Sequence, residues 1–523
     1  MAVLTLTGFA DTEQVWLPSL FVLDPTDPTI ILTATETTVT VTATSQYVQG
    51  PVTITVAGYG FTYFDDGSGE QGWPLSGYVE SITLEVARQV WMTATELAIE
   101  LPDLDHFMFG WERFGMFRPG NGFDFFSLML GGDDTINGSD NGDDIIGGRN
   151  TGNDLINAGA GFDYISADAG NDTIYGGTEQ DTYSLSESFF DGSAYRGAVV
   201  NLATGLATDC WGGADVLESI EEVRGSRLAD RFIGSGNDEQ FAGLRGNDAI
   251  NGGGGFDIVR YDRDEEFGGQ LGVTVDLALR QATDGWGNTD TLRAIEGAIG
   301  TARADSFIGD RADNYFYGGL GADTFHGGAG RDTVDFYMDF QSVGAVVNLG
   351  RATGQVRNDG HGNIESLAGI EDLWGTRFAD SFIGDRWANF LFGDAGNDTL
   401  VGGGGNDTLE GSVGADRLTG GAGADSFQFS NRFSDGDPWG DTITDFVSGT
   451  DRLTFMVNDF AGMAEAQFQI GTEAGSEGQG WFFFHDAADQ LFWDADGIGG
   501  EEAVLVAYLN GVDVLVWSDF DLI

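Results

Sequence analysis

The residues of this chain with the clearest chemical pattern are acidic and stand nine positions apart. From Asp380 to Asp425 an Asp or Asn recurs every nine residues, and the residue two positions later is apolar each time. Glycines precede each of these acids, as in Gly402-Gly403-Gly404-Gly405-Asn406-Asp407-Thr408-Leu409-Glu410. One Gly-Asp turn would be an ordinary solvated loop, but a period shared by all three residue types predicts a repeated structural unit.

Each residue type has its own physical role in this nine-residue phrase. Successive glycines tolerate positive φ and close backbone approach, so their carbonyl oxygens can converge on one point. The Asp adds a carboxylate there, and the apolar residue points inward from a very short strand. Hard oxygen ligands in a flexible loop suit Ca²⁺, with roughly six to eight oxygens, better than Mg²⁺. The chain has only 4 His for a transition metal, so the pattern predicts multiple calcium sites.

Twenty positions follow the phrase, in blocks of six, four, four and six. Seventeen of these positions are Asp, and we predict that their carboxylates bind calcium: Asp134, Asp144, Asp154, Asp163, Asp172, Asp181, Asp230, Asp248, Asp257, Asp305, Asp323, Asp332, Asp380, Asp398, Asp407, Asp416 and Asp425. Glu239, Asn314 and Asn389 take the other three positions, and the sequence does not decide whether these three hold metal. The number and affinity of the occupied sites are likewise left open.

A period of 75 residues contains the shorter one. Asp230, Asp305 and Asp380 are 75 apart, and the spacer acids Asp209, Asp284 and Asp359 keep the same step, as do Ile220-Glu221, Ile295-Glu296 and Ile370-Glu371. Fixed periods are typical of a solenoid, in which each unit buries its apolar face only against its neighbours. Spacers such as Val273-Thr274-Val275-Asp276-Leu277 alternate like strands, and we expect them to extend the stack.

These residues resemble the RTX (hemolysin-type) calcium-binding repeat, Gly-Gly-x-Gly-x-Asp-x-apolar-x, a known calcium-binding signature. The resemblance covers roughly residues 129 to 430. It implies a parallel β-roll with two nonapeptides per turn and ions held between neighbouring turns. Asp168 and Asp394 replace the second glycine of their phrases, and the resemblance implies weaker or empty sites there.

We therefore expect an all-β fold in three parts. Residues 129–430 form a parallel β-roll or β-helix solenoid. Residues 1–128 form an N-terminal β-rich domain of sandwich or jelly-roll type, because Thr and apolar residues alternate in stretches such as Thr37–Thr42, Val52–Val56 and Ser81–Val86. Residues 431–523 form a C-terminal β cap that shields the last layer of the solenoid.

The C-terminal part carries a second resemblance. Asp441-Thr442-Ile443-Thr444-Asp445-Phe446 resembles the end of serralysin-type secreted proteins. The tail Asp519-Phe520-Asp521-Leu522-Ile523 is similar to an uncleaved type I secretion signal. The N-terminus has neither a basic region nor a continuous apolar run, so we predict no N-terminal signal peptide. The resemblance implies export by type I secretion machinery to the extracellular space or cell surface.

Charge limits the partners. The chain has 84 acidic and 23 basic residues, for a formal charge of −61, which argues against nucleic acid and against an anionic membrane surface. No apolar run reaches the roughly 18 residues that span a bilayer. The only cysteine is Cys210, so no disulfide framework is expected. A divalent cation is the partner that remains.

Catalytic signatures are missing from the sequence, which contains neither His-Glu-x-x-His nor Gly-x-Ser-x-Gly. We predict a non-enzymatic surface-layer, matrix or adhesion component that could self-assemble. The alternative is a glycan-binding protein or a polysaccharide-active enzyme whose active part is residues 1–128, with Trp73, Tyr78 or Trp111 contacting sugar. The sequence does not decide what the N-terminal domain binds or whether the protein self-assembles.

Overall fold

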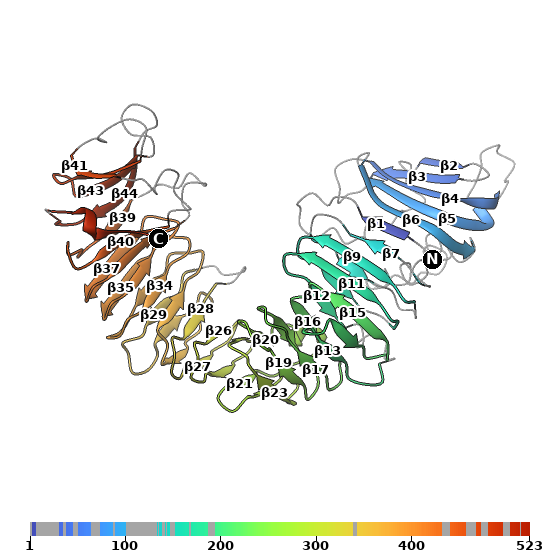
Figure 1. Ribbon diagram of the computed structural model, residues 1–523, viewed down its shortest axis with the longest axis horizontal. Coiled ribbons are helices and arrows are strands. Elements are labelled where there is room, and N and C mark those ends of the chain that lie inside the picture. The colour runs from blue at the N-terminus through green and yellow to red at the C-terminus, as the bar shows by residue number, and fades with distance from the viewer. Residues whose placement is uncertain are drawn as a thin grey trace. The chain divides into compact units, whose positions relative to one another are not determined.

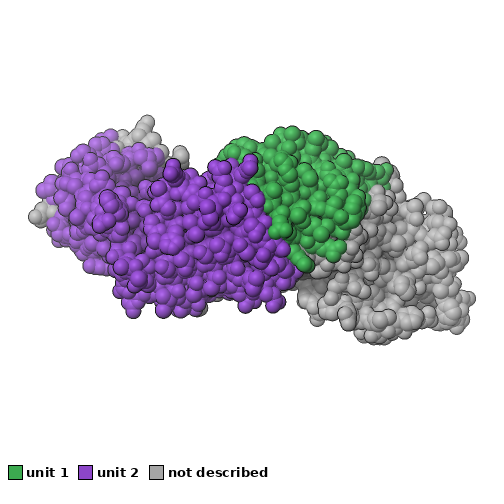
Figure 2. Space-filling model, turned by 90° about the horizontal axis from the view of Figure 1, so that it is seen from below, with its two compact units in different colours: residues 1–259 green, residues 260–523 purple. Residues whose placement is uncertain are grey.

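A computed structural model describes most of the chain between residues 152 and 523. The described residues are 152–166, 169–186, 194–337, 343–430, 440–456, 467–471, 480–494, 503–512 and 514–523, with short pieces at 133, 135–138, 142 and 144–146. Before residue 101 the structure describes only the backbone of six strands. The chain divides into two compact units, residues 1–259 and 260–523 (Figure 2).

The N-terminal strands of the first unit form one antiparallel sheet in the order β2-β3-β4-β5-β6-β1. Its last strand, β1, then pairs in parallel with β7, the first strand of the repeat region. The strands of this sheet are β1 (Val3–Leu6), β2 (Ile31–Ala34), β3 (Thr38–Thr44), β4 (Pro51–Tyr63), β5 (Pro74–Val86) and β6 (Gln89–Glu100).

The repeat region of the first unit is a coil with two parallel faces (Figure 1). Leu155 pairs with Thr173 on one face and Tyr164 with Thr182 on the other, so each turn contains 18 residues, or two nonapeptides. The first face contains β7 (Thr135–Asn137), β9 (Leu155–Ala160), β11 (Thr173–Thr178), β15 (Ala214–Glu218), β17 (Arg231–Ile233) and β19 (Ala249–Asn251). The second face contains β8 (Asp144–Ile146), β10 (Tyr164–Ser166), β12 (Thr182–Ser184), β16 (Glu222–Arg224), β18 (Gln240–Ala242) and β20 (Ile258–Arg260).

Each spacer adds strands to one face only. In the first unit, β13 (Val199–Asn201) and β14 (Leu206–Thr208) form an antiparallel hairpin between β15 and β17, while β16 and β18 pair directly on the other face. The second unit repeats this arrangement twice, with β21 (Thr274–Asp276) beside β22 (Gln281–Thr283), and β29 (Val346–Asn348) beside β30 (Val356–Asn358). The spacers do extend the stack, as the sequence predicts, but by an antiparallel hairpin on a single face.

The second unit is a coil of the same kind. Its first face contains β23 (Thr289–Arg293), β25 (Ser306–Ile308), β27 (Thr324–His326), β31 (Ser366–Ala368), β33 (Ser381–Ile383), β35 (Thr399–Gly404), β37 (Arg417–Ala422) and β39 (Asp441–Ile443). Its second face contains β24 (Gly297–Ile299), β26 (Tyr315–Tyr317), β28 (Thr333–Asp335), β32 (Asp372–Trp374), β34 (Phe390–Phe392), β36 (Thr408–Glu410), β38 (Ser426–Phe429) and β40 (Arg452–Phe455). The second unit also contains two short 3-10 turns, η1 (Asp264–Phe267) and η4 (Trp517–Asp519).

The C-terminal strands close both faces. On the first face β39 pairs with β44 (Val504–Leu509), which continues into β43 (Gln490–Asp494), β42 (Trp481–His485) and β41 (Gln467–Ile470). On the second face β40 pairs in parallel with β45 (Phe520–Leu522), the last strand of the chain. The parallel register thus continues past residue 430, where the sequence places the start of the cap.

The core lies between the two faces and is built from the central residue of each short strand. The typical three-residue strand has its middle side chain buried and its two neighbours partly exposed, because successive side chains of a strand point to opposite sides. Phe307, Phe316 and Phe325 are each at most 1% exposed, and the rings of Phe307 and Phe325 stack with centroids 5.1 Å apart. The apolar residue of each phrase therefore has the inward position that the sequence predicts.

The all-β architecture and the parallel roll are confirmed. The expected N-terminal sandwich needs two sheets, whereas the strands described before residue 101 form one sheet. The predicted boundaries at residues 128 and 430 stay predictions. Within the described part of the chain, no helix has the length and apolar character needed to cross a bilayer.

Candidate metal centre

The predicted aspartates of the repeats are buried. Asp134 lies outside the described residues, and Asp144 lies in β8 without a described side chain. The other fifteen are each at most 4% exposed, and so are Glu239, Asn314 and Asn389. A solvated turn would leave these side chains in water, so burial excludes the simplest alternative to a binding role.

One carboxylate oxygen of many repeat aspartates links two turns of the roll. The backbone N–H of Asp380 donates to Asp398 Oδ1 at 2.7 Å, and the N–H of Asp398 donates to Asp416 Oδ1 at 2.8 Å. The N–H of Asp407 donates in the same way to Asp425 Oδ1 at 2.9 Å. These bonds join residues 18 positions apart, so the carboxylates form a ladder along each edge of the roll, called here the carboxylate ladder.

The second carboxylate oxygen is buried without a donor at several rungs. Oδ2 of Asp181, Asp323, Asp332, Asp398 and Asp407 has no hydrogen-bond partner. This oxygen faces the first glycine of its own phrase. A Cβ placed on Gly327 would lie 2.4 Å from Asp332 Oδ2 and 1.9 Å from the carbonyl oxygen of Gly369 in the adjacent turn. The missing side chain thus lets a carboxylate oxygen and a main-chain carbonyl come close together.

Burial also makes the charged form of these carboxylates unfavourable. Desolvation raises the pKa of Asp398 to about 9 and that of Asp323 to about 8, and repulsion by neighbouring aspartates adds to both shifts. On the other edge, desolvation raises the pKa of Asp332 and of Asp407 to about 6. Backbone N–H donors oppose these shifts without cancelling them. The ladder is therefore electrostatically strained at neutral pH unless a cation compensates its charge.

The donor set fits a hard cation. Rungs such as Asp332 offer a carboxylate oxygen without a donor and, beside it, a carbonyl oxygen of the next turn, which are the ligands that Ca²⁺ takes in proteins. At Asp230, Asp305 and Asp380 a backbone N–H four residues earlier donates to the second oxygen instead. Among the residues that the structure describes, no three His, Cys, Asp or Glu side chains form a ready-made metal cluster. A bound ion would therefore draw its ligands from the carboxylates and carbonyls of neighbouring turns rather than from one side-chain cage.

Two positions where Asn replaces Asp are satisfied without an ion. Asn389 Nδ2 donates to the carbonyl oxygen of Glu371 at 2.9 Å, and Asn314 Nδ2 donates to that of Glu296 at 3.2 Å. The amide thus hydrogen-bonds a carbonyl of the neighbouring turn and adds no charge. Glu239 differs, because its Oε2 is buried without a donor, as at the Asp rungs.

The ladder contains acids that a period of nine does not find. Each accepts the backbone N–H of a repeat Asp, either across a spacer or at the C-terminal end. The pairs, with the donating repeat Asp first and the accepting acid second, are Asp172 and Asp215 (3.0 Å), Asp181 and Glu221 (3.0 Å), Asp332 and Glu371 (3.1 Å), Asp416 and Asp441 (3.0 Å), and Asp425 and Asp451 (3.1 Å). Spacers and longer loops displace them by 25 to 43 positions instead of 18. An apolar residue two positions after each acid, such as Leu217 after Asp215, is the signal that would have identified them.

Comparison with known proteins agrees with this geometry. A family model of the RTX calcium-binding nonapeptide repeat matches residues 149–183, 225–264, 299–334, 367–400, 374–409 and 392–427. The chain therefore carries RTX repeats, which bind multiple Ca²⁺ ions. No curated protein matches the chain.

Among solved structures, the crystal structure of the extracellular lipase LipA from Serratia marcescens is similar to this chain, with 20% sequence identity and a TM-score of 0.16. The match covers 56% of this chain and spans 40% of the length of the lipase chain.

The raised carboxylate pKa values predict how the stability of the calcium-free protein depends on pH. An acid whose folded pKa lies above its unfolded value stabilises the fold at pH below the unfolded pKa, and this contribution is lost as pH rises through the folded pKa. With folded pKa values of about 6 to about 9 at the rungs above, the β structure that the calcium-free chain forms near pH 5 should be lost as the pH rises to about 9. Circular dichroism in calcium-free buffer across this range measures this, and a β spectrum that grows with rising pH would contradict the prediction.

The glycine beside each rung predicts a steric effect. Gly327→Ala places a Cβ 1.9 Å from a backbone carbonyl and 2.4 Å from Asp332 Oδ2, so it should lower the calcium-loaded stability by about 1–3 kcal/mol and weaken calcium binding. The matched control is Gly236→Ala, because a Cβ there meets nothing within 4 Å. Calcium titration and thermal unfolding of both variants give the comparison. Equal behaviour of the two variants would argue against the close approach described here.

Proposed function

Because the chain carries RTX calcium-binding repeats, we propose that the protein is exported and that its roll folds when Ca²⁺ binds outside the producing cell. One observation carries the proposal: buried repeat carboxylates such as those of Asp398 and Asp407 have an oxygen without a hydrogen-bond partner. We propose the seventeen predicted aspartates as the calcium ligands of the repeats, with Asp215, Glu221, Glu371, Asp441 and Asp451 as further acids of the same ladder.

Electrostatics explains why the metal would control folding. Without Ca²⁺, carboxylates on successive turns repel one another and oppose collapse. Each Ca²⁺ compensates two negative charges and ties adjacent turns, so its binding free energy becomes folding free energy. Extracellular modules bind Ca²⁺ at roughly 10⁻⁴ to 10⁻³ M, far above cytosolic concentrations. The chain would then remain unfolded in the producing cell and fold after export.

The C-terminal tail supports recognition before folding. In the folded chain Asp519 is fully buried and accepts hydrogen bonds from Ser448 Oγ at 2.6 Å and the N–H of Gly449 at 2.8 Å, while β45 pairs with β40. A type I secretion apparatus that reads this tail would therefore have to meet the chain before the last layer forms. Export by this route, with the secretion machinery as a partner, is part of the proposal.

For the finished structure we propose a non-enzymatic role as a surface-layer, matrix or adhesion component. The support is the extent of the repeats: each unit has a carboxylate ladder of its own, in which the repeat residues bind ions and stack turns. Repetition of this kind provides a long, regular surface rather than a single reaction site.

The calcium trigger is tested with the full chain. Circular dichroism should show loss of the β spectrum in EGTA and its recovery when Ca²⁺ is added in the millimolar range expected of extracellular modules, roughly 1 mM. Mg²⁺ at the same concentration is the matched control and should restore little structure, because it requires a stricter octahedron. A β spectrum that does not respond to the chelator would overturn the proposal.

Glycan binding is the second candidate, and one feature of the roll favours it. Tyr315, Trp374 and Phe392 lie on the outer side of the second face, where Trp374 packs edge-on against both rings at 5.9 and 6.3 Å. Trp374 is 40% exposed, and exposed aromatic rows are common at binding surfaces. Of the aromatics predicted from the sequence, Trp73 and Trp111 lie outside the described residues, and Tyr78 lies in β5 without a described side chain.

Two measurements on calcium-loaded protein separate the candidates. Ordered sheets or fibres in electron micrographs support the structural role, whereas soluble monomers retained by a glycan array support the second candidate. If the aromatic row binds sugar, Trp374→Ala should reduce retention by about tenfold or more, the effect of losing about 1.4 kcal/mol. Trp387→Ala, at another exposed Trp, should leave retention unchanged.

A further inference from the structure

Each spacer hairpin ends in a turn that differs from the nonapeptide by one additional acid. In the turns 209–215, 284–290 and 359–365, an Asp stands one position before the place of the first glycine, and the ladder acid follows six positions later. These residues are Asp209 with Asp215, Asp284 with Asp290, and Asp359 with Glu365, and each is at most 4% exposed. Among the twenty nonapeptide positions, only the phrase of Asp416 also has a carboxylate at the earlier position, that of Glu410.

In the first of these turns, Asp209 holds the loop and also presents a free oxygen. Its Oδ1 accepts the N–H groups of Trp211 at 2.9 Å and Gly213 at 2.7 Å. Its Oδ2 is buried without a hydrogen-bond partner. A Cβ on Gly213 would lie 2.6 Å from Asp209 Oδ2 and 1.6 Å from the carbonyl oxygen of Gly170. The free oxygen of Asp209 and this carbonyl therefore lie on either side of the same glycine.

Two further carboxylates face the same region. Asp215 accepts the N–H of Asp172 on Oδ1 at 3.0 Å and the hydroxyl of Tyr183 on Oδ2 at 2.6 Å. Asp172 lies beside Gly170, since a Cβ on Gly170 would lie 2.8 Å from Asp172 Oδ1. Asp172, Asp209 and Asp215 are thus all buried along the same edge of the first face, where the spacer joins the roll.

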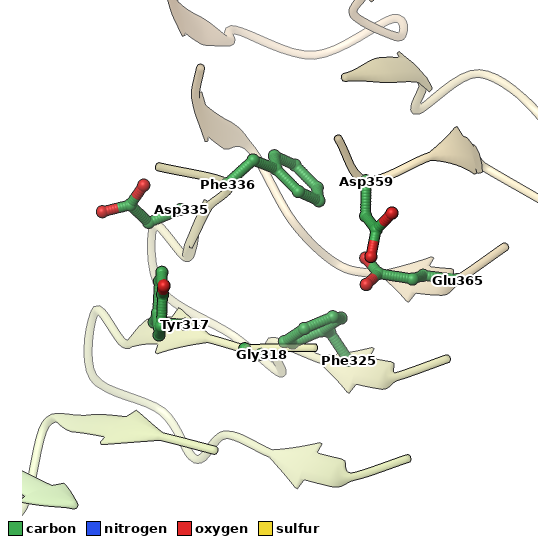
Figure 3. A pocket seen from close by; sticks show the side chains of 8 residues that line it. Tyr317, Gly318, Phe325, Asp335, Phe336, Asp359 and Glu365 are labelled. Atoms are coloured by element: carbon green, nitrogen blue, oxygen red, sulfur yellow. The ribbon is translucent and has the colours of Figure 1, made fainter. Parts of the chain in front are cut away.

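The turn 359–365 repeats this arrangement with a longer acid. Glu365 is 4% exposed, its Oε2 has no hydrogen-bond partner, and its carboxylate points toward that of Asp359 in a small cavity (Figure 3). Asp323 is the neighbouring ladder acid, since its carbonyl accepts the N–H of Ser366 at 3.1 Å. Phe336 lines the cavity and has no hydroxyl comparable to that of Tyr183.

We propose that the turns 209–215 and 359–365 each bind one further Ca²⁺ ion, in addition to the ions of the nonapeptides. The ligands are Asp209, Asp215 and Asp172 at the first site, and Asp359, Glu365 and Asp323 at the second. A buried carboxylate without a donor is costly, and a divalent cation removes that cost by ligating its free oxygen. An all-oxygen set with three negative charges selects Ca²⁺ rather than a softer metal.

The two sites, called here the spacer sites, differ from the repeat sites in their ligands. A nonapeptide site takes one carboxylate from each turn, whereas a spacer site adds the carboxylate that also caps its own loop. No three of these side chains form a preformed cluster among the described residues, so ion binding must draw them together. The inference rests on the proposed function, because the spacer turns take up this position only after the roll has folded with Ca²⁺.

The test counts bound ions in the full chain by equilibrium dialysis with Ca²⁺. Asp209→Asn retains an oxygen that can accept the loop N–H groups but removes the charge, and Glu365→Gln does the same at the other turn. Each variant should bind one ion fewer than the unaltered chain, and the double variant two fewer, with the calcium-induced β spectrum retained. Asp276→Asn is the matched control, because Asp276 also caps a spacer turn, by accepting the N–H of Leu279, and is not a proposed ligand.

Terbium luminescence gives a second readout if a variant folds poorly. Trp211 lies within the first turn and can sensitise Tb³⁺ bound there, so Trp211→Phe should lower the emission while leaving the calcium count unchanged. An unchanged count in both acid variants, or unchanged emission in Trp211→Phe, overturns the spacer sites and leaves the proposed function intact. An unaltered chain that binds no Ca²⁺ overturns the proposed function itself.

Discussion

A buried carboxylate that lacks a positive partner is the constraint on which this structure depends. The roll places an acid at nearly every edge position, and backbone N–H groups satisfy only one of its two oxygens, as at Asp398 and Asp407. Glycines at positions such as 327 are required because a side chain would occupy the space beside the other oxygen. Stacking of the turns and binding of the cation therefore cannot be separated energetically, since the stacking itself creates the unfavourable charge.

The sequence predicts the periodic part of this arrangement, because the nine-residue spacing equals half of the 18-residue turn. Residues nine apart alternate between the two faces, and residues 18 apart stack. The spacing therefore predicts the inward apolar side chains and the repeat acids, and the resemblance to the RTX repeat implies the register of two nonapeptides per turn. The spacing of nine does not identify the spacer acids as members of the ladder, although Glu221 and Glu371 belong to the period of 75 residues. Their partners Asp181 and Asp332 are about 40 residues away, and only the fold shows that a hairpin fills the interval.

The positions that depart from the repeat show how local chemistry adjusts the ladder. Asn389 replaces a charged oxygen by an amide that hydrogen-bonds Glu371, so that rung needs no compensation. Glu239 retains the acid and a donor-free buried oxygen. In the sequence, Asn389 and Glu239 are both departures from the motif. The hydrogen bonds show that Asn389 forms a neutral cross-link between turns, whereas Glu239 retains its charge. Side-chain geometry of this kind does not follow from spacing.

The 18-residue register also determines how the chain can reach this structure. Within the nonapeptide blocks, the described strands pair with strands one turn earlier or later, so the contacts there are local in sequence. Each added turn needs a formed neighbour but no distant segment, so loop-closure entropy is small at every step. Folding of such a stack is a nucleated, zipper-like propagation, and the slow step is the formation of the first pair of stacked turns.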